Sequence, residues 1–156
     1  MIEERARVDI MGFAMSEDNL KKVLSSQLMM VSSDASAKAP YGLLAKSKPH
    51  PRGYVTFPRV LGRYCRDENV LDLPTAVKKM TSMPAEKMGL KLRGQLKKGY
   101  FADIVIFNPE TVTDNATFMN PHQYPTGIDY VIVNGKITID KGKHTGKHAG
   151  HVLRKV

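Results

Sequence analysis

Two side chains suited to acid–base chemistry flank a loop in the first third of the sequence. Asp34 directly follows the apolar run QLMMVSS (residues 27–33), and His50 lies between two prolines in the segment KPHPR. Barrels and open α/β sheets place catalytic groups where a strand ends and a loop begins, so Asp34 is a candidate catalytic carboxylate. Its position fits equally well an aspartate that caps the following turn. The rigid segment could direct the His50 imidazole into a site, but the position alone favours a plain surface-loop residue.

Metal and thiol chemistry have weaker support in the sequence. His144, His148 and His151 follow one another at i, i+4 and i+7, which on a helix would place three imidazoles on one face and suit zinc. Two intervening glycines weaken any helix there, so a solvated tail is the favoured interpretation. His122 is expected in a loop. Cys65 falls on the apolar face of an expected helix, which favours a small buried side chain over a nucleophile.

The elements that must hold these side chains begin with helices. Four helix patterns start at Ser16, at Thr56, at Asp72 or Leu73, and at Pro84. The first has Ser16 as its N-cap, carries acids in its first turn and extends to residue 26. The second is expected to run to about Asp67, with Thr56 as its cap and Pro58 in its first turn. The fourth is short and stops at Gly89.

The remaining segments predict strands and one long loop. Residues 27–33 are apolar without polar alternation, as in a strand buried on both faces. Residues 35–55 contain three prolines and two glycines and are expected to form a long loop, and loops of that kind are usually functional or disordered. Residues 102–107 read as a strand. Residues 130–139 predict two strands joined at the Asn-Gly pair 134–135, because both residues accept the positive φ of a tight hairpin turn.

Composition limits the classes of protein that fit. The chain has 156 residues, 42% of them hydrophobic and 25% charged, which fits one folded domain and excludes a disordered or collagen-like chain. A complete (β/α)8 barrel needs roughly 250 residues, so this chain is too short to form one by itself. A single cysteine and the lack of a long apolar run predict a cytoplasmic protein without a membrane partner. The net charge of +9 raises nucleic-acid binding as an alternative, but five basic residues lie in a Gly-rich tail without aromatics, which disfavours it.

Several segments taken together resemble one enzyme family. In order they are MVSSDAS (30–36), KPHPRGYVTFPRVLGRY (48–64), AVKKMTSMPAEKMGLKLRGQLKKGYFADIVIFNPETV (76–112), GIDYVIVNGK (127–136) and KHTGKHAGHVLR (143–154). This series is similar to the C-terminal part of the N-acyl-D-amino-acid deacylases (D-aminoacylases), which are metal-dependent amidohydrolases. The resemblance covers nearly the whole chain from about residue 10 onward.

The resemblance implies an α/β fold in two parts. Residues 1–91 would be the last strand-helix portion of an incomplete (β/α)8 barrel, and residues 92–156 the C-terminal antiparallel strands of a small β-sandwich with a tail. The family uses zinc to hydrolyse the amide of an N-acyl-D-amino acid to a carboxylate and a D-amino acid. Its aspartate at the end of the eighth strand matches Asp34, which would take a proton from a zinc-activated water and give it to the leaving amine. His50 and Arg52 match the HPR segment and are expected on the rim of the substrate site.

The metal ligands of the family have no counterpart in this chain. They come from earlier strands, and the 33 residues before Asp34 contain no His or Cys, while Ala35 replaces the family's glycine. The resemblance therefore predicts a chain that alone binds no zinc specifically and is inactive, with Asp34 as a neighbour of the metal. Its uncovered surfaces would pair with the missing N-terminal barrel portion or with further copies of the chain. A non-catalytic oligomeric interaction module derived by truncation is the main alternative.

Overall fold

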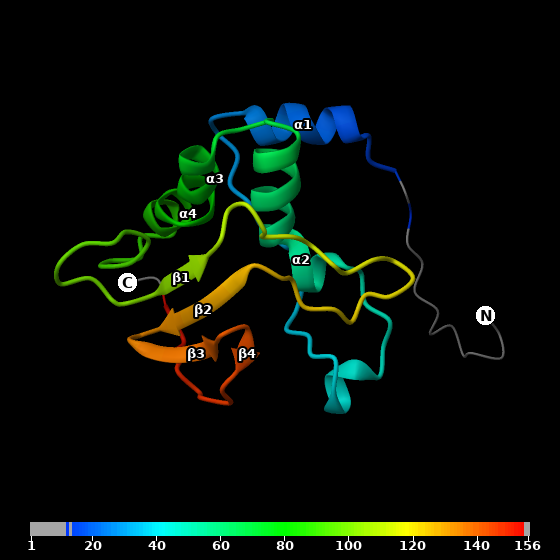
Figure 1. Ribbon diagram of the computed structural model, residues 1–156. Coiled ribbons are helices and arrows are strands. Elements are labelled where there is room, and N and C mark those ends of the chain that lie inside the picture. Colours follow the sequence, from blue (N-terminus) through cyan, green and yellow to red (C-terminus); the bar gives the residue numbers. More distant parts are fainter. Residues whose placement is uncertain (1–11, 13, 155–156) are drawn as a thin grey trace.

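The chain folds as helices followed by a small antiparallel sheet. The computed structural model describes residues 12 and 14–154. Its elements are α1 (Glu17–Ser25), the 3₁₀ helix η1 (Gly42–Ala45), α2 (Arg52–Arg59), the π-helix η2 (Val60–Asp67), α3 (Leu73–Met80), α4 (Ser82–Lys87), β1 (Ile104–Phe107), β2 (Ile128–Val133), β3 (Lys136–Asp140) and β4 (Lys143–His144). In Figure 1 the helices α1, α3 and α4 lie above the sheet. No helix in this described part is both long and apolar enough to cross a bilayer.

Three of the helices form where the sequence predicts them. Ser16 caps α1 by accepting the backbone N–H of Asn19 at 3.2 Å, and Asp72 caps α3 by accepting that of Thr75 at 2.8 Å. Gly89, with a φ of +70°, follows the end of α4 in the left-handed conformation that glycine favours. The predictions of these helices are confirmed, although α4 begins two residues before the predicted start.

The second predicted helix starts earlier and changes its hydrogen bonding midway. α2 begins at Arg52, directly after Pro51, so Thr56 is not its cap; the Thr56 hydroxyl instead donates to the carbonyl of Arg52 at 2.9 Å. Pro58 consequently lies inside the helix and not in its first turn. The helix continues from Val60 as the π-helix η2. A proline inside a helix removes one N–H donor and so interrupts the hydrogen-bond ladder just before this change.

The apolar run 27–33 does not form the predicted strand. No ladder partner lies beside it among the described residues, and the N–H of Val31 donates instead to the carbonyl of Lys79 at 3.2 Å. Leu28 is 90% exposed, although Val31 packs against the core. A buried strand needs neighbouring strands to pair its backbone groups. The prediction of a strand that ends at Asp34 is therefore wrong for the described chain.

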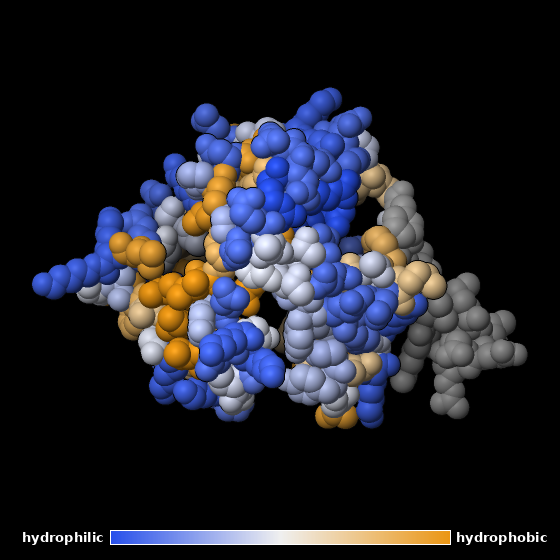
Figure 2. Space-filling model, in the orientation of Figure 1, coloured by the Kyte–Doolittle hydropathy of each residue, from blue (hydrophilic) through white to orange (hydrophobic). Residues whose placement is uncertain are grey.

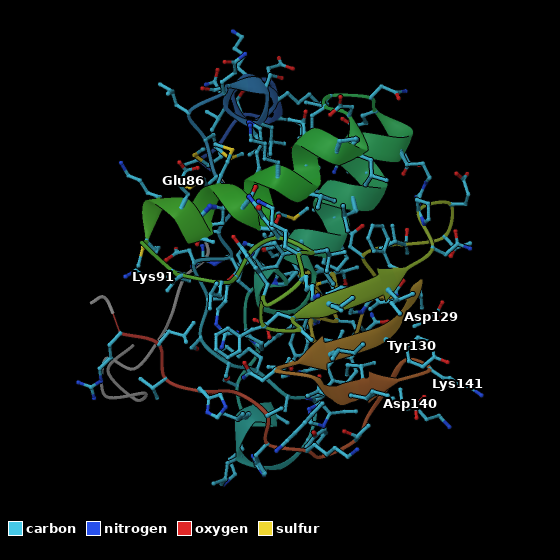
Figure 3. The ribbon with its side chains drawn as sticks, turned by 90° about the vertical axis from the view of Figure 1, so that its left-hand side faces the viewer. Glu86, Lys91, Asp129, Tyr130, Asp140 and Lys141 are labelled. Atoms are coloured by element: carbon cyan, nitrogen blue, oxygen red, sulfur yellow. The ribbon has the colours of Figure 1, made fainter. Side chains whose placement is uncertain are left out.

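The sheet has the order β1-β2-β3-β4 and is antiparallel throughout. Asn134 and Gly135 join β2 to β3 with φ values of +48° and +77°, which confirms the hairpin and its turn conformation. Tyr130 pairs with Asp140, and Figure 3 shows both at the same end of the sheet. The two-residue strand β4 was not predicted.

Apolar side chains occupy both faces of this sheet. Ile104 lies opposite Ile132, and Val105 lies opposite Val131 on the other face, since neighbouring residues of a strand point to opposite sides. Val105 is 52% exposed, and Figure 2 shows hydrophobic side chains gathered over the strands. Part of the apolar surface of the sheet is therefore left uncovered by the residues that the structure describes.

The core lies between the helices and the segment that follows β1. Its buried residues are Leu24, Val60, Leu61, Tyr64, Cys65, Leu71, Ala76 and Val112. The backbone of Val112 runs between two glycines: a Cβ on Gly62 would stand 2.5 Å from the Val112 carbonyl oxygen, and one on Gly127 would stand 2.5 Å from the Val112 nitrogen. Arg66 also donates to that carbonyl at 2.7 Å. This crossing is here called the Val112 seam. It joins the helical half of the chain, which ends with α4, to the strand half, which begins with β1.

Candidate functional site

Asp34, His50 and Arg52, which the family resemblance assigns to the substrate site, line one open depression of about 190 Å³. Asp34 and the residues that follow it form one side, and His50 and Arg52 form the other. Arg52 is the first residue of α2, which begins earlier than predicted. Lys38 also lines the depression and was not singled out from the sequence. Its only sequence signal is a basic side chain four residues after Asp34.

Asp34 presents its carboxylate to solvent. Its φ is +47°, a left-handed conformation that Asp tolerates better than most residues, and its N–H donates to the Ser32 hydroxyl at 3.4 Å. The carboxylate lies 3.1 Å from Nη2 of Arg52, and the Asp34 side chain is 86% exposed. An exposed ion pair of this kind contributes little stability, so the carboxylate and the guanidinium can exchange partners readily.

His50 forms a wall of the depression. Its Nδ1 accepts the backbone N–H of Arg52 at 3.0 Å, and its ring packs edge-on against Phe118 with centroids 4.9 Å apart. Burial, followed by the nearby charge of Arg52, lowers the pKa of His50 from 6.5. Both effects favour the neutral imidazole, in which Nδ1 can accept the N–H at the start of α2.

The charges around the depression suit an anionic ligand. Lys38 and Arg52 supply two cations, and Asp34 is the one carboxylate among the residues that line it. Arginine offers a planar pair of N–H donors that matches a carboxylate, whereas lysine acts as a point charge. The depression can therefore receive a carboxylate next to the exposed oxygen atoms of Asp34.

Metal ligands are not assembled around these residues. Among residues 12 and 14–154, no group of three or more His, Cys, Asp or Glu side chains could hold a metal ion. The charged neighbours of Asp34 in the depression are cations, and Nδ1 of His50 is already in use. The donor set present here does not fit a zinc centre.

The tail histidines and Cys65 do not line the depression. His144 lies in β4 and its Nδ1 accepts the N–H of Gly146 at 3.0 Å, while His148 and His151 lie in irregular backbone, so the helical spacing that suits zinc is not formed. Cys65 is buried, as predicted, and burial raises the pKa of its thiol to about 11.

A loop from the strand half contacts His50, which lines the depression, and sequence reasoning missed this contact. Residues 113–126, here called the strap, bring His122 against Tyr54 of α2 and Phe118 against His50. The aromatic residues in this stretch are visible in the sequence. Nothing in their spacing indicates a partner 68 residues away.

Comparisons with known proteins find similarity along most of the chain. The sequence model described as "Amidohydrolase family" matches residues 41–139. D-aminoacylase of Alcaligenes xylosoxydans xylosoxydans is 46% identical over 141 residues, which are 90% of this chain and 28% of that protein. This chain therefore spans little more than a quarter of the length of that relative.

Two solved structures are similar in fold as well as sequence. The crystal structure of a D-aminoacylase matches with a TM-score of 0.80 and 45% identity over 89% of this chain and 28% of that chain. N-acyl-D-glutamate deacylase from Bordetella bronchiseptica, complexed with zinc and a phosphonate inhibitor that mimics the tetrahedral intermediate, matches with a TM-score of 0.73 and 42% identity. That match covers 81% of this chain and 25% of the other.

Proposed function

The chain belongs to the amidohydrolase family, and from this premise we propose that it forms part of a zinc-dependent N-acyl-D-amino-acid deacylase. Such an enzyme hydrolyses the amide of an N-acyl-D-amino acid to a carboxylate and a free D-amino acid. The similarity to D-aminoacylase over 90% of the chain supports this assignment. Since the chain spans 28% of that relative, the activity belongs to the proposed whole protein, and the chain alone is expected to be inactive.

The observation that carries the proposal is the exposed Asp34 carboxylate beside Arg52 and Lys38. An N-acyl-D-amino acid has a carboxylate close to its amide bond. Arg52 would receive that carboxylate, which brings the amide toward Asp34. In the reaction Asp34 would take a proton from the attacking water and then give it to the nitrogen of the leaving amine. We place the zinc ligands in the part of the relatives that this chain does not span.

We also propose a division of the chain between the two parts of such an enzyme. Residues 1–91 would belong to the barrel and residues 92–156 to the small β-sandwich. The last helix ends at Lys87 and the first strand begins at Ile104, which supports a boundary between them. Residues 1–11, 13 and 155–156 lie outside the described part of the chain. The cytoplasmic location stays a prediction.

The test uses the chain alone and a chimera. The chimera is the D-aminoacylase of Alcaligenes with its matching segment replaced by this chain. The chain alone is expected to turn over no N-acetyl-D-amino acid, whereas the chimera should hydrolyse it. Asp34→Asn in the chimera should lower kcat at least about 100-fold, the usual contribution of a general acid–base group. Asp129→Asn, an exposed carboxylate at the start of β2, is the matched control and should leave kcat unchanged.

Zinc content and circular dichroism establish that each chimera is folded and loaded with metal. A folded, zinc-loaded chimera without turnover would overturn the proposed function. Full activity in the Asp34→Asn chimera would overturn the role of Asp34 while leaving the family assignment intact.

The uncovered apolar sheet favours a second candidate, a non-catalytic interaction module. Val105 and Ile106 are about half exposed, at 52% and 48%, and such surface commonly marks an interface. Sedimentation of the chain over a range of concentrations tests this candidate. A monomer at every concentration would count against it.

A further inference from the structure

The strap has a conformation of its own. Its two ends are held together because Thr113 and Thr126 exchange backbone hydrogen bonds of 3.1 and 3.2 Å. Within it, the N–H of Thr117 donates to the carbonyl of Asn120 at 3.0 Å, and the N–H of Asn120 donates to the Thr117 hydroxyl at 2.9 Å. A surface loop closed at its base and braced internally is an Ω-loop, and such loops are frequently functional.

The strap lies beside the segment that leads from Asp34 into α2. In Figure 1 the yellow loop runs next to the cyan stretch that contains η1. An ion pair between Arg59 of α2 and Asp114 holds the beginning of the strap. Phe118 touches the His50 ring, which is itself a wall of the depression.

His122 joins the strap to two points on this neighbouring segment. Its Nε2 lies 2.7 Å from the carbonyl oxygen of Ser47, and its Nδ1 lies 2.9 Å from the hydroxyl of Tyr54. A carbonyl oxygen can only accept, so Nε2 must carry a hydrogen, and in the tautomer with its hydrogen on Nε2 the other nitrogen can accept. Nδ1 is then the acceptor, and the Tyr54 hydroxyl donates to it. One tautomer therefore satisfies both contacts.

These two contacts bracket the residues that form one side of the depression. Ser47 precedes the segment KPHPRG (residues 48–53), and Tyr54 directly follows it. Within the segment, two prolines restrict the backbone, and the N–H of Arg52 donates to Nδ1 of His50 at 3.0 Å. Because the segment is short and stiff, fixing both of its ends fixes the place of Arg52.

We infer that His122 is a positioning residue, which holds the segment 48–53 at both ends and so sets the Arg52 guanidinium beside Asp34. The effect on Arg52 as a receptor for the substrate carboxylate rests on the proposed function. The two contacts of His122, to Ser47 and to Tyr54, are here called the clamp. The clamp does not rest on the proposed function, because it concerns only contacts within this chain.

The clamp is tested on the 156-residue chain by hydrogen exchange. His122→Phe keeps a ring and removes both hydrogen bonds, and His122→Gln keeps an acceptor and a donor. Losing the clamp should speed exchange of the Arg52 and Gly53 amides at least about tenfold, the equivalent of a lost hydrogen bond. The Gln variant should recover part of this protection. His148→Phe, in the exposed tail, is the matched control.

Two results would overturn the clamp. One is unchanged exchange at Arg52 and Gly53 in His122→Phe. The other is an equal rise at the amides of β2 and β3, which would indicate general loosening of the fold. A nitrogen NMR spectrum of the imidazoles provides a further check, since His122 must carry its hydrogen on Nε2. A hydrogen on Nδ1 would contradict the assignment.

The consequence for Arg52 is tested in the chimera described above. With the N-acetyl-D-amino acid used in that test, His122→Phe should raise KM at least about tenfold and leave kcat within a few-fold, because the carboxylate receptor is displaced and Asp34 is not. A loss in kcat alone would refute the effect on Arg52. If the unsubstituted chimera is inactive, the proposed function fails, and hydrogen exchange still decides the clamp.

Discussion

Adding one methyl group at Gly62 tests whether the Val112 seam holds the two halves of the chain together. Gly62 is buried within η2. A Cβ there would stand 2.5 Å from the Val112 carbonyl oxygen, whereas an ordinary contact begins at 3.4 Å. The neighbouring atom belongs to the backbone, which cannot rotate away as a side chain can. The helix and the segment after β1 must therefore separate by most of an ångström.

Three contributions set the size of the effect of Gly62→Ala. Alanine is favoured over glycine inside a helix by about 0.5–1 kcal/mol. Overpacking of a core costs about 1–3 kcal/mol. Separation of the seam also disturbs the 2.7 Å hydrogen bond from Arg66 to Val112, and a bond from a charged donor is worth about 1.5–3 kcal/mol. The free energy of unfolding should fall by about 2–5 kcal/mol, and Tm by roughly 5–15 °C.

Thermal and urea unfolding followed by circular dichroism measure this change. Gly53→Ala is the matched control, because Gly53 is also helical and its added Cβ would meet the flexible Lys38 side chain at 3.0 Å. That variant should be neutral or slightly more stable. If Gly62→Ala proves as stable as Gly53→Ala, the close approach at the seam is not real and the reasoning is refuted.

Three further predictions follow from single side chains. Asn134→Ala should lower the free energy of unfolding by about 2.5–5 kcal/mol, because a positive φ costs about 1–2 kcal/mol and the 2.6 Å bond from the charged Arg93 side chain is worth about 1.5–3 kcal/mol. Asn134→Gly should cost less, since glycine tolerates the positive φ, and equal losses in urea unfolding would contradict this. Cys65, whose pKa is about 11, should react with iodoacetamide at about pH 8 only on unfolding, and rapid labelling of the native chain would be inconsistent with its burial. Hydrogen bonds from Lys21 and Arg63 hold the pKa of Glu68 below 4.5 in the folded chain. The Glu68 carboxylate therefore stabilises the fold above pH 4.5, and this stabilisation is lost as the pH falls through the lower pKa of the folded state. Glu68→Gln should therefore flatten the decline of Tm below pH 4.5, and an unaltered decline would exclude this carboxylate as a cause.

Local signals in the sequence predicted those elements whose stabilising contacts are local. The cap at Ser16 acts on a residue three positions away, and the Asn134-Gly135 turn needs only its own backbone conformation. Both could be predicted because capping and turn preferences act within a few residues. The start of α2 at Arg52 was not predicted. Thr56 and Pro58 also fit a helix start, and no local rule separates a start at Thr56 from a start at Arg52.

Contacts between distant residues explain what sequence reasoning missed. The run 27–33 has the composition of a buried strand, but pairing depends on neighbours that the described chain does not supply. Asp34 and Arg52 could be proposed for one site through the family resemblance, and the structure brings them within 3.1 Å. The contact between Tyr54 and His122 joins residues 68 positions apart, and no periodicity in the sequence encodes such a pair.

The Val112 seam also bears on where this chain can be divided. Val112 comes from the strand half, yet its side chain is fully buried in the core of the helical half. Cutting the chain between residues 91 and 92 would remove that side chain from the helices and leave a hole the size of a valine among them. Neither piece would keep a closed interior. The proposed boundary between residues 91 and 92 is thus a poor site for dissection, and the two halves should melt in one cooperative transition.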